Sequence, residues 1–356
     1  MRSTISTAAM LATLLSLVVL SSAHDDNSTQ YTLTDDLSYK NFFSAFDFFD
    51  GPDPTQGFVQ YQNQTSAVDK NLVGYLEDTQ SVFMGVDYTT KDPAGRASVR
   101  LESKKSWNQG LYLPANWLLS SSAAWPQGSE IDFLEGVNDY DSNTVTLHTT
   151  KGCMVDNSTS SSSGSGMSDH LNLPFSGTMA TGDCDIAPPN QDKKVGCSIH
   201  APKALFVTTQ TGSGGTATAQ DFAYPSYGTD FNKAGGGVYT MEWTSTSISF
   251  TKHFDSNIST TTTSPDPSIW STPMARFDGA DCDFTERFEN LKIIFNTAFC
   301  GEWAGKEWDK SCAKKTGVST CEAYVCDNPA AFTEAYWEAA GLKWFQKVIC
   351  IYDFIF

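Results

Sequence analysis

The chain has 356 residues and a formal net charge of −18 at pH 7, from 23 Lys and Arg against 41 Asp and Glu. This acidic excess disfavours DNA, RNA and acidic lipid surfaces as partners, because like charges repel. Hydrophobic residues make up 40% of the chain and aromatic residues 13%, which supports a packed core and excludes a disordered chain. With only 18% charged residues, the composition fits a β-rich extracellular protein that handles an uncharged ligand.

The first 23 residues have the pattern of a secretory signal peptide. Arg2 precedes an apolar run over residues 8–20, and Ser21 and Ala23 provide the small residues that a cleavage site needs. The run is too short to cross a bilayer, so a membrane anchor is the weaker alternative. Four Asn-x-Ser/Thr sequons agree with a secreted route: Asn27, Asn63, Asn157 and Asn257. We therefore expect a protein of the extracellular space or cell wall, free of the membrane once residues 1–23 are removed.

Short runs of alternating or apolar β-forming residues recur along the chain and are separated by turn residues. They cover residues 57–61, 98–101, 144–148, 238–243 and 291–295. Two low-complexity segments, 158–166 and 212–218, are interpreted as solvated loops. A sustained helical pattern occurs only over residues 329–340. The pattern predicts one domain over residues 24–346, built as an antiparallel sandwich or barrel.

All nine cysteines lie beyond residue 150, and in an oxidising compartment they predict disulfides. They are Cys153, Cys184, Cys197, Cys282, Cys300, Cys312, Cys321, Cys326 and Cys350. A zinc site is the alternative because Cys321 and Cys326 are five positions apart, but no Cys-x-x-Cys pair or paired His accompanies them. The odd number leaves one thiol over. We expect this to be Cys350, in the apolar C-terminal tail 347–356, to which the sequence assigns no role.

The most informative segment is 125–136, Trp-Pro-Gln-Gly-Ser-Glu-Ile-Asp-Phe-Leu-Glu-Gly, where three carboxylates alternate with large apolar residues. On a regular strand Glu130 and Asp132 share one face and Glu135 points to the other. A single β-bulge near residues 133–134 adds one residue and returns Glu135 to the face of the other two acids. The three acids then line a cleft, while the apolar residues between them face the core.

Two glutamates placed in this way have the arrangement of a retaining glycosidase, whose carboxyl groups lie about 5–5.5 Å apart. One glutamate is the nucleophile and the other the general acid/base. Asp132 between them adds a charge and a hydrogen bond that help to keep one proton on one glutamate. We expect His148, on the next strand-like run, to reach the same face and tune the acid. The residues alone leave two alternatives open, an acidic exposed edge strand and a calcium site.

The motif Glu-Ile-Asp-Phe-Leu-Glu, between Trp-Pro-x-Gly and the following Gly-Val-Asn and Val-Thr-Leu-His-Thr, resembles glycoside hydrolase family 16. It is most similar to the secreted fungal-type endo-1,3(4)-β-glucanases, or laminarinases. Further similar stretches are residues 43–61, 95–100, 227–244 and 293–305. The resemblance covers residues 40–346. It implies an all-β fold, a β-jelly-roll sandwich of two curved antiparallel sheets with a concave substrate cleft.

The resemblance also implies the roles of individual residues. Glu130 matches the nucleophile, Glu135 the acid/base and Asp132 the assisting carboxylate. Aromatic and basic side chains matched to the cleft are Trp117, Trp125, Trp303 and Arg100, with His148 added from the strand argument. A flat indole covers the apolar face of a pyranose ring, although a place in the core or at the rim is the alternative for each Trp. No metal or organic cofactor is implied, because the carboxyl pair is sufficient for the chemistry.

Two segments depart from the family pattern. Only residues 111–113 separate Gly110 from Pro114, where relatives have a longer segment that commonly contains another strand and a Cys-Gly-x-Trp. A missing strand would damage the concave sheet, and its lost cysteine would explain the odd cysteine count. The apolar tail has no family counterpart. Trp243, in contrast to the matched indoles, is assigned to the core.

The expected function is retaining endo-hydrolysis of β-1,3-linked glucans by a monomer, with mixed 1,3/1,4-linked glucans left open as substrates. Two other functions use the same surface: a glucan-binding protein without turnover, and a cell-wall transglycosylase. The presence of both glutamates favours an enzyme over a binding protein. Water and sugar compete for the same glycosyl-enzyme, so the sequence does not rank hydrolysis against transfer.

Overall fold

The computed structural model describes residues 31–113, 117–121, 124–155, 175–203, 225–253 and 263–348. The two low-complexity segments, most of the apolar tail, Cys350 and three of the four sequons lie outside these ranges. No helix within them is both long enough and apolar enough to span a bilayer.

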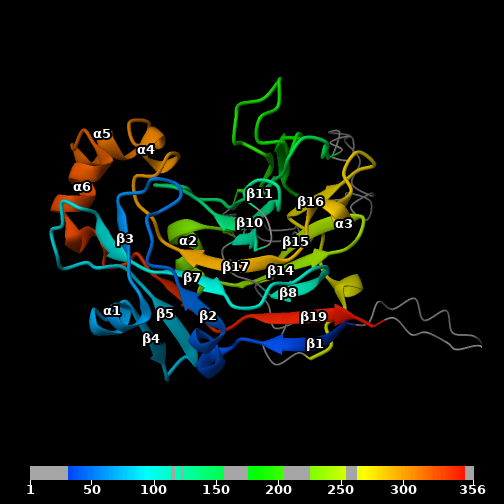
Figure 1. Cartoon of the computed structure of the whole chain (residues 1–356), viewed down its shortest axis with the longest axis horizontal. Coiled ribbons are helices and arrows are strands. Elements are labelled where there is room, and N and C mark those ends of the chain that lie inside the picture. Colours follow the sequence, from blue (N-terminus) through cyan, green and yellow to red (C-terminus); the bar gives the residue numbers. More distant parts are fainter. Residues whose placement is uncertain are drawn as a thin grey trace, which may run out of the picture.

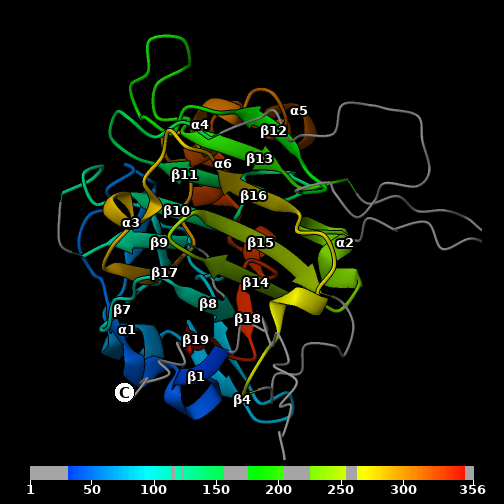
Figure 2. The ribbon, with the colours of Figure 1, turned by 90° about the vertical axis from the view of Figure 1, so that its right-hand side faces the viewer.

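Two antiparallel sheets form the body of the protein (Figures 1 and 2). The eight-stranded sheet has the spatial order β12 (Thr178–Thr181), β13 (Cys197–His200), β11 (Thr144–His148), β10 (Glu130–Glu135), β9 (Trp117–Ser120), β17 (Leu291–Asn296), β7 (Arg100–Ser103) and β2 (Phe46–Phe48). The six-stranded sheet has the order β1 (Tyr31–Asp36), β19 (Lys343–Lys347), β8 (Gly110–Leu113), β14 (Val238–Trp243), β15 (Ser247–His253) and β16 (Ala275–Asp278).

Smaller elements surround the two sheets. A three-stranded sheet contains β18 (Trp337–Ala339), β5 (Ser81–Met84) and β4 (Val73–Leu76), and β3 (Val59–Tyr61) pairs in parallel with β6 (Arg96–Ser98). The α-helices are α1 (Gln64–Asp69), α2 (Gly228–Lys233), α3 (Phe284–Arg287), α4 (Ala304–Glu307), α5 (Cys312–Thr316) and α6 (Cys321–Asp327). Short 3₁₀ turns cover Tyr39–Asn41, Phe43–Ala45, Pro267–Ile269 and Pro329–Phe332.

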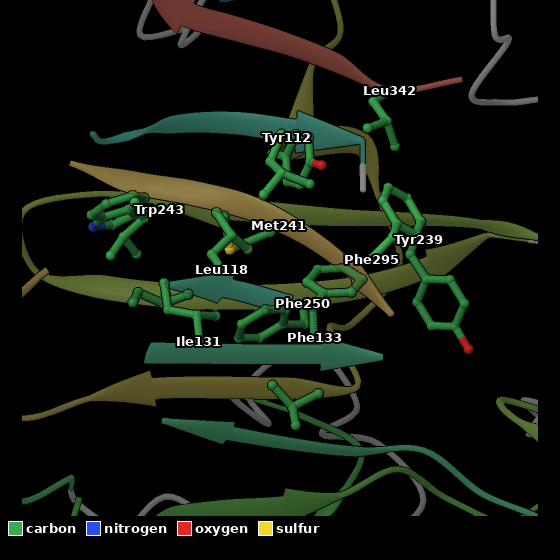
Figure 3. Close-up of a cluster of buried hydrophobic side chains, with 14 of the residues drawn as sticks. Tyr112, Leu118, Ile131, Phe133, Tyr239, Met241, Trp243, Phe250, Phe295 and Leu342 are labelled. Atoms are coloured by element: carbon green, nitrogen blue, oxygen red, sulfur yellow. The ribbon is translucent and has the colours of Figure 1, made fainter. Parts of the chain in front are cut away.

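The main core lies between the two large sheets. Figure 3 shows Ile131 and Phe133 of β10 in the same cluster as Met241, Trp243 and Phe250 of the six-stranded sheet. All five side chains are buried, and the rings of Phe133 and Phe250 are 4.9 Å apart between centroids. The assignment of Trp243 to the core is confirmed. One face of β10 is therefore fixed inside the sandwich, and the opposite face points away from it.

The shortened segment after Gly110 leaves both large sheets continuous. β8 pairs with β14 and β19 in one sheet, and β9 pairs with β10 and β17 in the other. The eight-stranded sheet is thus unbroken at β9, and the absence of a family strand stays a prediction from the sequence. The chain changes sheets between β8 and β9, so a short connection there costs the eight-stranded sheet no pairing at β10.

The helix predicted from the pattern over residues 329–340 is not formed, so this prediction is wrong. Only a 3₁₀ turn forms at its start, and the segment then becomes β18, whose Trp337 is opposite Met84 of β5. The Trp337 Nε1–H also donates to Thr297 Oγ1 at 3.1 Å. These contacts with segments far away in the sequence outweigh the local helical preference. The helices of this region, α4, α5 and α6, lie instead over residues 304–327.

The described residues contain three disulfides: Cys153–Cys282, Cys184–Cys197 and Cys300–Cys321. The bond to Cys300 removes Cys321 as a zinc ligand, so the zinc alternative at Cys321 and Cys326 is wrong. Cys312 and Cys326 have no bridge. The expectation that a single cysteine is left over is therefore also wrong.

We predict that the two bridges nearest β11 and β13 stabilise the fold unequally. Cys153 and Cys282 are separated by 129 positions, and Cys184 and Cys197 by 13. Constraint of the unfolded chain then gives about 5 kcal/mol for the long loop and about 3 kcal/mol for the short one. Guanidinium unfolding of the two double Cys→Ser variants measures both losses. An equal loss, or a larger loss for the short loop, would contradict this ranking.

Candidate active site

A bulge in β10 brings its three acids to one face. Glu130 is paired with His148 and Asp132 with Thr146, but Glu135 is paired with Thr144. Two residues of β10 separate Asp132 from Glu135, whereas one residue of β11 separates their partners. The partners alternate regularly along β11 and share a face, so the three acids share it too. The predicted bulge is confirmed.

We call this surface the site face: the face of the eight-stranded sheet that points away from the core and carries Glu130, Asp132 and Glu135. β10 lies between β9 and β11, so the alternative of an exposed edge strand is wrong. Within the described ranges, no group of three or more His, Cys, Asp or Glu side chains is arranged to hold a metal ion.

A hydrogen-bonded chain connects four of the predicted residues. The Trp125 Nε1–H donates to Glu130 Oε2 at 2.5 Å. Glu130 and Asp132 are themselves hydrogen-bonded through their side chains. Asp132, only 3% exposed, has its Oδ2 3.0 Å from His148 Nε2. His148 therefore does reach the site face, where its contact is to Asp132.

The electrostatics of the three acids favour their neutral forms. Burial raises the pKa of Glu130 to about 8 and the charge of Asp132 adds to this, whereas His148 and the Trp125 hydrogen bond oppose it. Burial raises the pKa of Asp132 to about 7. The pKa of Glu135 lies well above its ordinary value, through burial first and then the charges of Asp132 and Glu130. The site therefore holds protons near neutral pH that isolated carboxyl groups have lost.

Arg100 and Trp117 lie next to these acids on the same sheet. Trp117 is directly opposite Asp132 in the β9–β10 pair. Its Nε1–H donates to Asn296 Oδ1 at 2.8 Å, and the Arg100 guanidinium lies 5.0 Å from its ring. Arg100 is 3% exposed and donates from Nε to Glu102 Oε1 at 2.9 Å. The indole is thus held at both its edge and its face.

Trp303 lies apart from the hydrogen-bonded chain, just before α4. It is 37% exposed and makes an edge-to-face contact with Tyr140, with ring centroids 5.8 Å apart. Tyr140 is within electrostatic range of Glu135, whose charge contributes to raising the Tyr140 pKa after burial and Glu307. Trp125 is similarly exposed, at 39%. These two indoles are the predicted aromatic side chains with the most surface left to contact a ligand.

Several residues of the site were not found from the sequence. Asn143 bonds the backbone of the bulge, Asn296 orients Trp117, and the Tyr227 hydroxyl donates to the carbonyl of Gly136 at 3.3 Å. Tyr227 lies within a stretch that resembles the family, but no motif gave it a role. Asn143 lies in the turn between two recognised strands, and its side chain carries no charge that would have marked it.

Comparison with known proteins identifies the family. The chain matches the XgeA-like catalytic domain of glycoside hydrolase family 16 over residues 46–224 and 204–345. The chain belongs to this family. It is 35% identical to an endo-1,3(4)-β-glucanase of Arthroderma benhamiae, over 93% of this chain and 68% of that protein. It is 34% identical to the endo-1,3(4)-β-glucanase xgeA of Emericella nidulans, over 90% of this chain but only about half (48%) of that protein.

Two solved structures of family 16 share the fold. Laminarinase 16A from Phanerochaete chrysosporium is 30% identical, with a TM-score of 0.71 over 89% of this chain and all of that one. An elongating family 16 β-1,3-glucosyltransferase is 33% identical, with a TM-score of 0.70 over the same shares. The predicted all-β jelly-roll sandwich is confirmed, as is the placement of the chain among glycoside hydrolases of the endo-1,3(4)-β-glucanase type.

We predict that Glu135→Gln stabilises the folded protein near pH 8. The folded-state pKa of Glu135 lies above its unfolded value, so stability falls as pH rises above about 4.3, the unfolded pKa. A neutral amide removes this loss, so the variant should have a higher unfolding free energy than wild type at pH 8. Urea unfolding at pH 4 and pH 8 measures it.

The gain should be much smaller at pH 4, where most of the carboxyl is protonated in the unfolded state as well. Glu334→Gln is the matched control, because Glu334 is exposed, and it should not reproduce the stabilisation at pH 8. A Glu135→Gln protein that is less stable than wild type at pH 8 would contradict the assignment of a half-buried Glu135 that retains its proton.

Proposed function

We propose that this chain hydrolyses internal linkages of β-1,3-glucans, and of mixed 1,3/1,4-glucans, with retention at the anomeric carbon. The observation that carries the proposal is the bulge, which sets Glu130 and Glu135 on one face with Asp132 between them. The relatives named as endo-1,3(4)-β-glucanases support the choice of substrate. Glu130 is the nucleophile, Glu135 the general acid/base and Asp132 the assisting carboxylate.

In the first step Glu135 acts as the acid. Its neutral carboxyl gives a proton to the glycosidic oxygen while a Glu130 carboxylate oxygen attacks the anomeric carbon. The C–O bond to the leaving sugar breaks and an ester bond to Glu130 forms. Attack needs Glu130 ionised, and both the Trp125 N–H and the potential of His148 favour that state. Asp132 accepts the proton that the Glu130–Asp132 pair shares.

In the second step the same groups reverse their roles. Glu135, now a carboxylate, takes a proton from a water that attacks the anomeric carbon, and the ester bond to Glu130 breaks. Both glutamates return to their starting protonation states. Two inversions at the same carbon give net retention. No metal or organic cofactor enters either step.

The aromatic and basic residues of the site face would bind the glucan. Trp125 and Trp303 have exposed indole surface that can cover the apolar C–H faces of glucose rings. Trp117 is held more rigidly, because the buried Arg100 packs over the face of its ring. We assign the first two to direct stacking and Arg100 to orientation of Trp117.

Transglycosylation is the second candidate function, and one observation favours it. The chain is as similar to the elongating β-1,3-glucosyltransferase as to the laminarinase. A sugar hydroxyl in place of water in the second step gives a longer glucan by the same chemistry. Product length therefore separates the two functions.

Incubation with laminarin and with barley β-glucan tests the proposal. Wild type should release reducing ends, and NMR should detect the β-anomer first. Glu130→Gln should fall to background because the ester bond cannot form, whereas the surface control Glu334→Gln should remain fully active. Equal activity of Glu130→Gln would overturn the nucleophile assignment. Binding without products would favour the glucan-binding protein, and products longer than the substrate would favour transfer.

We further propose that the protein is secreted as a monomer, with residues 1–23 removed and a single catalytic domain over 24–346. The three disulfides agree with an oxidising compartment. Protein recovered from the culture medium should begin at His24, as N-terminal sequencing would determine. A variant lacking residues 2–23 should stay inside the cell. Medium protein that retains the first 23 residues would contradict cleavage at this site.

A further inference from the structure

We propose that Asn143 is a positioning residue, which holds the bulge of β10 in the one conformation that presents Glu135 for proton transfer. The inference rests on the proposed role of Glu135 as acid/base. Asn143 lies just before β11 and its side chain is fully buried. Its amide bonds backbone groups of β10, so its effect on the Glu135 carboxyl would be exerted through the backbone.

The Asn143 amide bonds the two backbone groups on either side of the extra residue. Its Nδ2–H donates to the carbonyl of Phe133 at 2.7 Å, and its Oδ1 accepts from the N–H of Glu135 at 2.9 Å. These groups flank Leu134, where a bulge interrupts the regular ladder and removes strand partners. A buried carbonyl or N–H left without a partner costs about 1–3 kcal/mol. A carboxamide supplies one donor and one acceptor in a single plane, which matches this pair of groups.

Asn143 is itself fixed from two sides. Its backbone N–H donates to Ser226 Oγ at 2.9 Å, and its carbonyl accepts from the N–H of Ala201 at 2.9 Å. Ser226 is buried, and its carbonyl accepts a hydrogen bond from the Tyr239 hydroxyl. We call the two hydrogen bonds of the Asn143 amide the clamp. Because Asn143 is tied to buried neighbours on both sides, the clamp can transmit a defined position to the bulge.

The two glutamates depend on different supports. Glu130 lies on the regular half of β10 and is oriented by Trp125 and Asp132. Glu135 lies beyond the bulge, and its own N–H is one of the two groups that Asn143 holds. Loss of the clamp should therefore displace Glu135 while leaving Glu130 in place. A displacement of about 1 Å is enough to cost roughly 100-fold in rate.

Leaving-group chemistry distinguishes this role from a general loss of structure. Hydrolysis of laminarin needs the acid, whereas 2,4-dinitrophenyl β-laminaribioside has a leaving group that departs without a proton. Asn143→Ala should lower kcat/KM for laminarin by about 10–100-fold and change kcat/KM for the dinitrophenyl glycoside less than about threefold. Azide, which attacks the glycosyl-enzyme without a base, should raise kcat for the dinitrophenyl glycoside and give the β-glycosyl azide.

Ile199→Ala is the matched control, because Ile199 is buried in β13 and makes no bond to the bulge. It should lower the melting temperature. It should change kcat/KM for laminarin and for the dinitrophenyl glycoside by the same factor, and azide should not raise its kcat. If Asn143→Ala lowers kcat/KM for both substrates by the same factor and azide does not raise its kcat, the positioning role is wrong. If Asn143→Ala does not fold, Asn143→Asp decides. Its added negative charge should move the basic limb of the kcat/KM profile to higher pH, and an unmoved limb would overturn the inference.

Glu135→Ala separates this inference from the proposed function. It should show the same substrate difference and the same azide response, in stronger form. Failure of Glu135→Ala to do so would overturn the acid/base assignment. If Glu135→Ala shows the substrate difference and the azide response but Asn143→Ala shows neither, the positioning role alone would be overturned.

Discussion

The structure of the site depends on the cost of holding three carboxyl groups together on one face of a single strand. Burial and mutual repulsion make their ionisation unfavourable, so the folded protein retains protons that the unfolded chain releases. The opposite face of β10 offsets this cost. There Ile131 and Phe133 are buried against the six-stranded sheet, and each such side chain contributes about 1.5–3 kcal/mol when buried.

The bulge reconciles these two faces. Without it, regular alternation would turn Glu135 toward the core, where an unpaired charge costs several kcal/mol. One extra residue moves the carboxyl to the site face and leaves the core side of the strand intact. It also divides β10 into a regular half, with Glu130 and Asp132, and a displaced half with Glu135. The two glutamates, to which the proposed mechanism gives different roles, thereby acquire separate supports from the same strand.

The parts of the fold that follow local rules could be predicted from the sequence. The alternation of acids and apolar residues in β10 was sufficient to predict the strand, its bulge and its buried face. Prediction failed where distant segments decide the outcome. Residues 337–339 form a strand because β5 is available to pair with them, and the strands on the two sides of the short connection after Gly110 belong to different sheets. Neither partner can be read from the local pattern.

The same distinction applies within the site. Glu130, Glu135 and Trp125 were found because the chemistry proposed for them requires their residue types, and those types are visible in any sequence. Asn143 bonds backbone groups, which every residue possesses. The types of the residues that it contacts therefore do not reveal its role in the sequence. Its partners are defined only when the register of β10 against β11 is known. Residues proposed to touch the substrate are therefore accessible to sequence analysis, whereas residues proposed to hold them in position become visible only with the structure.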